Sequence, residues 1–136
     1  MKTKILFIVA VIMIGFLVSS CSKKTLIDIK NTSDQQYEIR FDGQVFSLGR
    51  NSVVELMHLA EEFTLLDPQG RNYSYTWKSL PPPPSEYIDR RFFNNRIRLL
   101  IDRDMKIYII KPDADNFARP AYQPSGFPLT NTTNPK

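Results

Sequence analysis

Short runs of alternating apolar and polar residues follow one another from residue 26 to residue 110, and turn-forming residues separate them. A period of two places the apolar side chains of a strand on one face, whereas an amphipathic helix needs a period near 3.6. Runs spaced roughly ten residues apart are typical of β-sandwiches and small barrels. No amphipathic stretch of helix length lies between the runs, so a parallel α/β sheet is not expected.

These runs predict an all-β fold, a small antiparallel β-sandwich of seven or eight strands. The pair Asp42-Gly43 predicts a tight hairpin, because both residue types accept a positive φ. Asp67–Gly70 and Asp102–Asp104 predict further turns, since Asp, Pro and Gly favour them. The predicted strands cover residues 26–30, 37–41, 45–48, 53–57, 63–66, 73–77, 97–101 and 105–110.

Two segments do not follow the alternating pattern. Pro81–Pro84 lack amide donors and stop any strand ladder, and Ser85 could then cap a short helix within residues 86–95. Residues 112–136 are rich in Pro, Asn and Thr without a period, which predicts a disordered or loosely draped tail. Its aromatic residues could anchor a partner or pack over a sheet edge; they are Phe117, Tyr122 and Phe127.

The N-terminus has the pattern of a secretory signal peptide, which we expect to be helical. Lys2 and Lys4 precede an apolar run from Ile5 to Val18, and small residues follow it. A membrane-spanning helix needs about 20 apolar residues, so this run is short for a permanent span.

The string Val18-Ser19-Ser20-Cys21 resembles the lipobox of bacterial lipoproteins: an aliphatic residue, two small residues and an invariant cysteine. The resemblance implies cleavage between Ser20 and Cys21, a diacylglycerol on the Cys21 thiol and attachment to the membrane through that lipid. The alternative is an uncleaved anchor helix with an incidental cysteine. Cys21 is the one cysteine in the chain, so a monomer has no disulfide.

The same resemblance predicts where the protein resides. In the enterobacterial members, Asp after the cysteine favours retention in the inner membrane, and here that residue is Ser22. It therefore implies the outer membrane, facing the periplasm. The expected division is a signal peptide at 1–20, a lipidated tether at 21–24, a β-sandwich at 25–111 and a flexible tail at 112–136.

Residues 26–70 resemble the PEGA-type small β-sandwich modules of bacterial envelope proteins. The matching positions are Asn31, Ser33, Asp42-Gly43 and Leu48-Gly49, and the Pro-Glu-Gly-Ala string itself is absent. This resemblance implies architecture and no particular function.

The charge balance does not indicate a nucleic-acid partner. The 18 Lys and Arg residues include Lys2 and Lys4, which cleavage removes, so the mature chain is close to neutral against its 14 Asp and Glu residues.

Residues able to carry catalysis or bind a metal are few. A Ser-His-Asp triad would have to use His58, the single histidine, and no Gly-x-Ser-x-Gly elbow accompanies it. A zinc site usually needs three or four His or Cys ligands. The carboxylate pairs Asp102/Asp104 and Asp113/Asp115 are more simply turn residues than a calcium or glycosidase site. We therefore expect no enzyme, no cofactor and no metal.

Two surface candidates remain. Tyr73, Tyr75 and Trp77 share one face of a strand, where they either form the core or stack on sugars. Arg90-Arg91-Phe92-Phe93, followed by Arg96 and Arg98, is either a docking patch or a solvated face beside a buried Phe pair.

The sequence thus predicts a lipid-anchored envelope protein with a non-catalytic structural or protein-interaction role and an envelope protein partner of unknown identity. The alternative is a carbohydrate- or peptidoglycan-binding module that uses the aromatic stripe. A hydrolase using His58 is a remote alternative.

Overall fold

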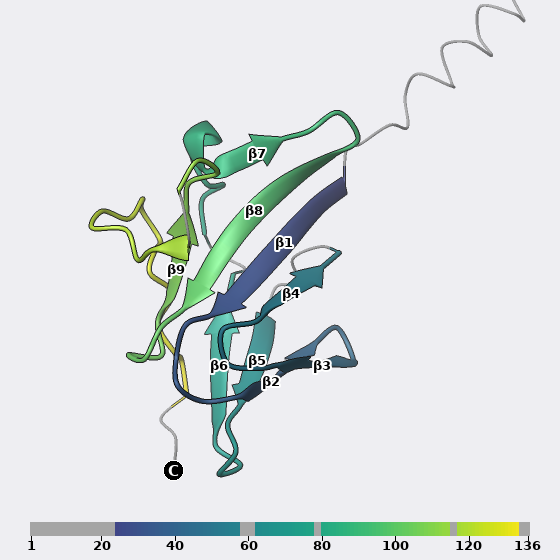
Figure 1. Cartoon of the computed structure of the whole chain (residues 1–136), viewed down its shortest axis with the longest axis vertical. Helices are drawn as coiled ribbons and strands as arrows, with labels where there is room; N and C mark the ends of the chain where they lie inside the picture. Colours follow the sequence, from purple (N-terminus) through teal and green to yellow (C-terminus); the bar gives the residue numbers. More distant parts are fainter. Residues whose placement is uncertain (1–23, 58–61, 78–79, 115–116, 134–136) are drawn as a thin grey trace, which may run out of the picture.

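Two β-sheets make up the part of the chain that the computed structural model describes, namely residues 24–57, 62–77, 80–114 and 117–133 (Figure 1). The all-β prediction is confirmed. The elements are β1 (Lys24–Asn31), β2 (Tyr37–Phe41), β3 (Gln44–Leu48), β4 (Val53–Leu56), β5 (Glu62–Leu66), β6 (Asn72–Thr76), the 3-10 helix η1 (Ser85–Tyr87), β7 (Ile88–Arg90), β8 (Asn94–Ile101) and β9 (Ile107–Ile110).

The two sheets have simple strand orders. One sheet runs β3-β2-β5-β6. In the other, β4 and β1 lie on one side of β8, while β7 and β9 share its other side. β7 pairs with residues 95–97 of β8, and β9 pairs with residues 98–101. β8 is therefore the central strand of its sheet, with a turn at each end.

The strand pairing corrects the expectation of a purely antiparallel sandwich. β1 and β8 pair in parallel along their whole length, from Lys24 beside Asn94 to Asn31 beside Ile101. Parallel strands need a long connection rather than a tight turn. Here the connection from β1 to β8 contains the whole of the other sheet, so no crossover helix is required.

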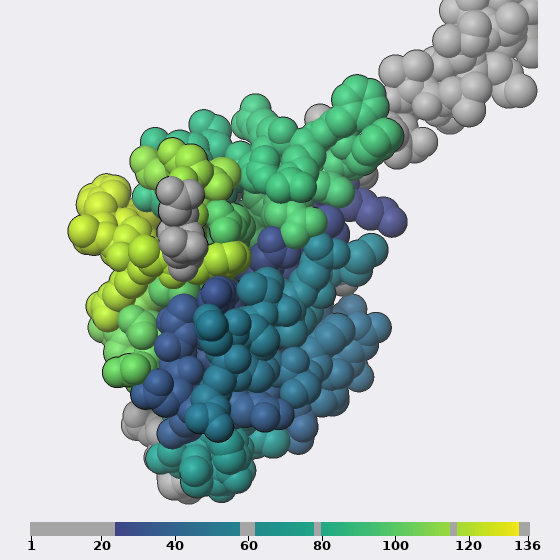
Figure 2. All heavy atoms as spheres, in the orientation of Figure 1, coloured from purple at the N-terminus to yellow at the C-terminus, as the bar shows by residue number. Residues whose placement is uncertain are grey.

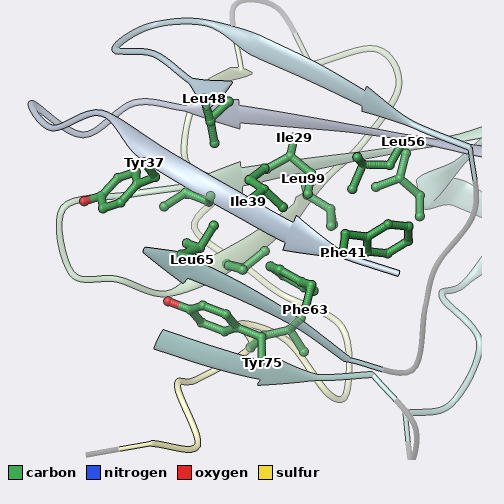
Figure 3. Close-up of a cluster of buried hydrophobic side chains, with 14 of the residues drawn as sticks. Ile29, Tyr37, Ile39, Phe41, Leu48, Leu56, Phe63, Leu65, Tyr75 and Leu99 are labelled. Carbon is green, nitrogen blue, oxygen red and sulfur yellow. The ribbon is translucent and has the colours of Figure 1, made fainter. Parts of the chain in front are cut away.

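The core lies between the two sheets and consists mainly of apolar residues that the alternation predicts, joined by Tyr87 and Leu129 from outside the predicted strands (Figure 3). Ile29 of β1 and Leu99 of β8 face Ile39 and Leu65 of the other sheet, and Ile27 of β1 belongs to the same cluster. All five are almost fully buried. Burial of such a side chain contributes about 1.5–3 kcal/mol, so the alternating pattern selects which face of each strand turns inward.

The β2–β3 hairpin has the turn that its sequence predicts. Asp42 has φ 47° and Gly43 has φ 72°. Positive φ at both central residues is the geometry whose twist matches the flanking strands. The hairpin register pairs Phe41 with Gln44 directly across this turn.

A buried asparagine joins the loops at one end of the sandwich. The Asn31 side chain donates to the carbonyl oxygens of Gln35 and Gly49, at 2.6 and 3.1 Å, and accepts from the Ser33 amide at 2.9 Å. A fully buried amide needs such partners. Asn31 and Ser33 thus serve as structural residues at the corner where β1 leaves its sheet.

The segment after the four prolines differs from the predicted short helix. Helical geometry lasts only from Ser85 to Tyr87, as η1, and the chain then becomes strand β7. Tyr87 is buried in the core, and the edge of β8 offers backbone partners to Ile88–Arg90. Tertiary pairing overrides the local helix signal, which raises the number of strands in the described residues to nine.

The C-terminal segment is draped over the sandwich along residues 117–133, so the draped alternative holds for this part and the disordered alternative is wrong. Leu129 pairs with Ile107 of β9 through two backbone hydrogen bonds, at 2.8 and 3.0 Å. The Gln123 side chain both donates to and accepts from the backbone of Ile109. These bonds satisfy the outer edge of β9, which would otherwise attract another strand.

The same segment also covers the β6 edge. The amide of Thr132 donates to the carbonyl oxygen of Ser74 at 2.8 Å, and Asn131 accepts from the amide of Ser74 at 3.1 Å. Phe117 packs with Ala114 on the outer apolar cluster of Leu100, Tyr108 and Ile110. The tail therefore closes one side of the sandwich, across both sheets.

Several predicted features lie outside the described residues: the signal helix, Ser20, Cys21 and His58. β1 begins at Lys24, so it includes the last residue of the predicted tether. Within the described ranges, no helix is long and apolar enough to span a bilayer.

Candidate functional site

Two turns flank β8 and differ sharply in chemistry. The turn before β8, which we call the aromatic turn, comprises residues 90–94. The turn after β8, the acidic turn, comprises residues 102–105. β8 has eight residues, so the turns lie about 25 Å apart at ~3.3 Å per residue.

Phe92 and Phe93 project from the aromatic turn into solvent. Phe92 is 84% exposed and Phe93 is 81% exposed, which makes them the most exposed large apolar side chains in the described part of the chain. Their rings contact each other edge to face, with centroids 4.8 Å apart. The Arg91 amide donates to the Asn94 carbonyl oxygen at 2.9 Å and closes the turn. The predicted buried Phe pair is therefore wrong.

The arginines near this turn fall into two groups. Arg90 and Arg91 are exposed, and Arg91 pairs with Asp89 at 2.9 Å. Arg96 instead binds Asp28 and Glu55, at 2.7 and 2.8 Å, on the outer face of the sheet.

Arg98 is also committed to the fold. Its guanidinium lies 4.0 Å from the ring centroid of Phe117 and donates to the carbonyl oxygens of Pro112 and Ala114. The exposed basic residues of the predicted patch are therefore those of the aromatic turn.

The aromatic turn lies beside the first residue of β1. Lys24 pairs with Asn94, so the exposed start of β1 and the aromatic turn occupy one corner of the molecule (Figures 1 and 2). Sequence patterns could not reveal this neighbour, because the parallel pairing joins residues 70 positions apart. The adjacency places Arg90–Phe93 next to the point where the N-terminal segment meets the sandwich.

The acidic turn is held in place by side chains from three parts of the fold. Tyr75, in the opposite sheet, donates its hydroxyl to the Met105 carbonyl oxygen at 2.7 Å. Tyr108 donates to Asp104 at 2.5 Å. Arg119 lies 4.5 Å from the Tyr108 ring centroid and pairs with Asp102 at 3.3 Å. The Asp102/Asp104 pair is thus a hairpin tip clamped by the tail.

The ionisation of this cluster follows from its contacts. Burial raises the pKa of Tyr108 to about 12, and its hydrogen bond to Asp104 adds to the effect. Burial opposes ionisation of Asp104, but the hydroxyl of Tyr108, the amide of Lys106 and the charge of Arg119 outweigh it, so the pKa of Asp104 lies below its usual value. The carboxylate is therefore kept charged by structural partners.

The aromatic stripe contributes to the core. Tyr75 is fully buried and stacks on Phe63, with ring centroids 5.2 Å apart. Tyr73 is buried and donates to Asp67 at 3.3 Å. Trp77 is partly buried and meets the ring of Phe127 edge to face at 5.4 Å. Stacking on a sugar requires exposed ring faces, and the burial of Tyr73 and Tyr75 corrects their assignment as possible ligand contacts.

The side of the sandwich opposite the tail is open. Among the described residues, no backbone group pairs with the outer edges of β3 and β4. Val45 on β3 and Met57 after β4 are each 59% exposed, and Val53 at the start of β4 is 46% exposed. Unpaired edges with apolar side chains can accept a strand from another protein.

Catalytic and metal-binding arrangements are not found in the described ranges. No three His, Cys, Asp or Glu side chains gather closely enough there to hold a metal ion. A surface depression of about 510 Å³ is open and includes Tyr37, Ser47 and Pro68 in its lining. Two carboxylates line it: Asp67 is bound by Arg71 and the turn amides, and Glu38 pairs with Arg40 at 2.9 Å.

Comparison with known proteins adds one distant structural likeness. No protein-family model and no curated protein matches the chain. A solved structure, described as the NMR structure of the protein from Eubacterium rectale, is 14% identical and has a TM-score of 0.36. The match covers 72% of this chain and 97% of that one.

Proposed function

We propose that this chain is a lipid-anchored bacterial envelope protein whose β-sandwich has a non-catalytic structural or protein-interaction role. The observation that carries the proposal is the string Val18-Ser19-Ser20-Cys21, placed after a basic and apolar N-terminus. Only two residues separate Cys21 from the first strand at Lys24. A chain lipidated at Cys21 holds its folded domain close to the bilayer surface.

The contacts of the described carboxylates support the non-catalytic part of this proposal. The buried carboxylates Asp28 and Asp67 are each bound by an arginine, and the Asp102/Asp104 pair is bound by Arg119. Groups engaged in this way serve the fold. Because residue 22 is Ser and not Asp, the lipoprotein resemblance implies the outer membrane, with the domain in the periplasm.

A protein-interaction role has one structural support, the open side formed by β3 and β4. An extended segment of another envelope protein would complete the hydrogen bonding of either edge. A photo-crosslinking residue at Val45, compared with one at the exposed Arg103 of the acidic turn, would capture that partner at Val45 only. Failure to recover a specific envelope protein at Val45 would count against the interaction role.

Metabolic labelling with radioactive palmitate, followed by membrane fractionation, tests the anchor. The wild type and Ser22→Ala should carry the label and sediment with the outer membrane, whereas Cys21→Ala should carry none. An unlabelled wild type with an intact N-terminus at Met1 would contradict lipidation. Label in the inner-membrane fraction would contradict the proposed location alone.

A further inference from the structure

We infer that the aromatic turn is a second membrane contact, in which Phe92 and Phe93 enter the lipid headgroup layer while Arg90 and Arg91 face anionic headgroups. This inference rests on the proposed lipid anchor at Cys21. It assigns a function to one corner of the sandwich and fixes which end of the domain faces the bilayer.

The composition of the turn calls for an explanation. Gly, Asn, Asp, Pro and Ser are the usual residues of tight turns, because their backbone and side chains suit the geometry. This turn carries two adjacent phenylalanines, 84% and 81% exposed, at the outermost point of a hairpin. Exposed apolar groups that gather at one point usually mark a contact site. Neither ring belongs to a core cluster of the described structure, and their ring planes meet each other edge to face.

The short distance between Cys21 and the aromatic turn indicates that the rings contact the bilayer. Cys21 precedes Lys24 by three residues, which span at most about 11 Å even when fully extended. Lys24 pairs with Asn94, and adjacent strands lie about 5 Å apart. The aromatic turn therefore lies within roughly 20 Å of the lipid-bearing residue.

The charges around the rings are also those expected of a surface that contacts an anionic bilayer. Lys24, Arg90 and Arg91 are exposed at this corner, and Asp89 is the acidic residue that pairs with one of them. Basic side chains close to the surface are attracted by anionic lipids, and aromatic rings favour the boundary between headgroups and acyl chains. The opposite end of β8 has no such excess of positive charge, because Arg119 pairs with Asp102 and Asp104 there and Arg103 pairs with Asp34.

The contact would orient the domain. The lipid on Cys21 alone is a single attachment. A second contact at the aromatic turn would direct β8 away from the membrane and place the acidic turn at the far end, about 25 Å out along the strand.

A depth measurement with an environment-sensitive dye tests this inference. Phe92→Cys and, as the matched control, Arg103→Cys are produced as full-length lipoproteins and labelled with NBD-maleimide. The proteins are then reconstituted into vesicles of phosphatidylethanolamine and phosphatidylglycerol. A lipidated Cys21 has no free thiol, so the dye reaches the new cysteine alone. Nitroxide-labelled lipids in the bilayer should quench the dye at position 92 several-fold more strongly than the dye at position 103.

The dye at position 92 replaces one of the two rings, so a second pair of variants places the dye elsewhere and tests the rings themselves. A dye at Arg90→Cys leaves both rings in place, and its quenching should fall when Phe92→Ser and Phe93→Ser are added. Circular dichroism should show the same fold in all variants, since the exchanged residues are exposed.

The two proposals can fail separately in this experiment. Equal quenching at positions 92 and 103, or none at either, in a protein whose mass shows a lipid on Cys21 would overturn the membrane contact alone. A wild-type protein whose Cys21 thiol takes up the dye would overturn the lipid anchor.

Discussion

The two turns that flank β8 differ in how their side chains relate to the rest of the fold. The acidic turn contains two aspartates, which are usual turn residues, and is tied to the molecule by Tyr75, Tyr108 and Arg119. The aromatic turn carries two rings that are 84% and 81% exposed and belong to no core cluster of the described residues. We infer that the first turn exists for stability and the second for contact with a surface. Substitutions in the two turns should therefore have opposite signatures.

The largest effect on stability is expected at Tyr108, which supports the acidic turn. Tyr108→Ala removes a ring buried against Leu100 and Ile110, so the free energy of unfolding should fall by about 3–5 kcal/mol. Phe92→Ser with Phe93→Ser should change it by less than about 0.5 kcal/mol. Urea unfolding of the full chain in detergent, followed by circular dichroism, measures both. Comparable losses in both variants would show that the aromatic turn is structural as well.

A smaller loss is expected when one hydroxyl is removed from the same support. Tyr75→Phe leaves the buried ring in place but deprives the Met105 carbonyl oxygen of its donor, which should cost about 1–2 kcal/mol. Tyr122→Phe is the matched control, because that ring is 75% exposed and its hydroxyl should not affect unfolding. If the two variants unfold alike, Tyr75 does not hold the acidic turn.

Arg119 should contribute less to the free energy of unfolding than the Tyr75 hydroxyl does. Its pairs with Asp102 and Asp104 are partly exposed, so Arg119→Gln should reduce stability by at most about 1 kcal/mol, and high salt should shrink the difference. Arg90→Gln, at the aromatic turn, should leave the free energy of unfolding unchanged. In vesicles that contain phosphatidylglycerol, it should weaken the quenching of a dye at position 92 by nitroxide-labelled lipids. A loss of stability in Arg90→Gln that matched the loss in Arg119→Gln would remove the contrast between the turns.

The smallest expected effect on stability comes from the Asp104 carboxylate and appears only at acidic pH. The pKa of Asp104 is lowered in the folded protein, so its contribution to stability is complete above the unfolded value of about 3.9 and is lost as the pH falls through the folded value. Asp104→Asn should therefore flatten the decline of stability below about pH 4. Asp67, whose pKa is also lowered, should maintain part of the decline. Unchanged pH profiles in Asp104→Asn would contradict this account, and the Phe92→Ser/Phe93→Ser protein should keep the wild-type profile.

The local pattern of the sequence is sufficient for most strands of this fold and for the Asp42-Gly43 hairpin. Alternation determines which side chains turn inward, so Tyr37–Phe41 and Phe63–Leu66 could be predicted with their buried faces. The pairing of β1 with β8 could not be predicted from the sequence, because it joins distant segments and depends on how the two sheets pack. β7 was missed for the same reason, since the edge of β8 overrides the local helix signal after Ser85.

The tail and the candidate site were predictable only in part. The Pro-rich composition correctly indicates that residues 117–133 form no regular element, but it does not show that the side chain of Gln123 occupies a strand edge. The sequence singles out Arg90–Phe93 as unusual, and the hydrophobic rule predicts burial of the rings. The rule fails here because a two-residue hairpin tip projects beyond any surface that could cover it.

The central claim is that the aromatic turn holds one end of the sandwich on the bilayer. Neutron reflectometry of the lipidated full-length protein on a supported bilayer tests it without any label. For the wild type, protein density should begin within the headgroup layer, with no intervening water. For Phe92→Ser/Phe93→Ser, a hydrated gap and a broader protein layer should appear. Identical profiles for the two proteins, with water beneath both, would contradict the claim and leave the lipid as the single attachment.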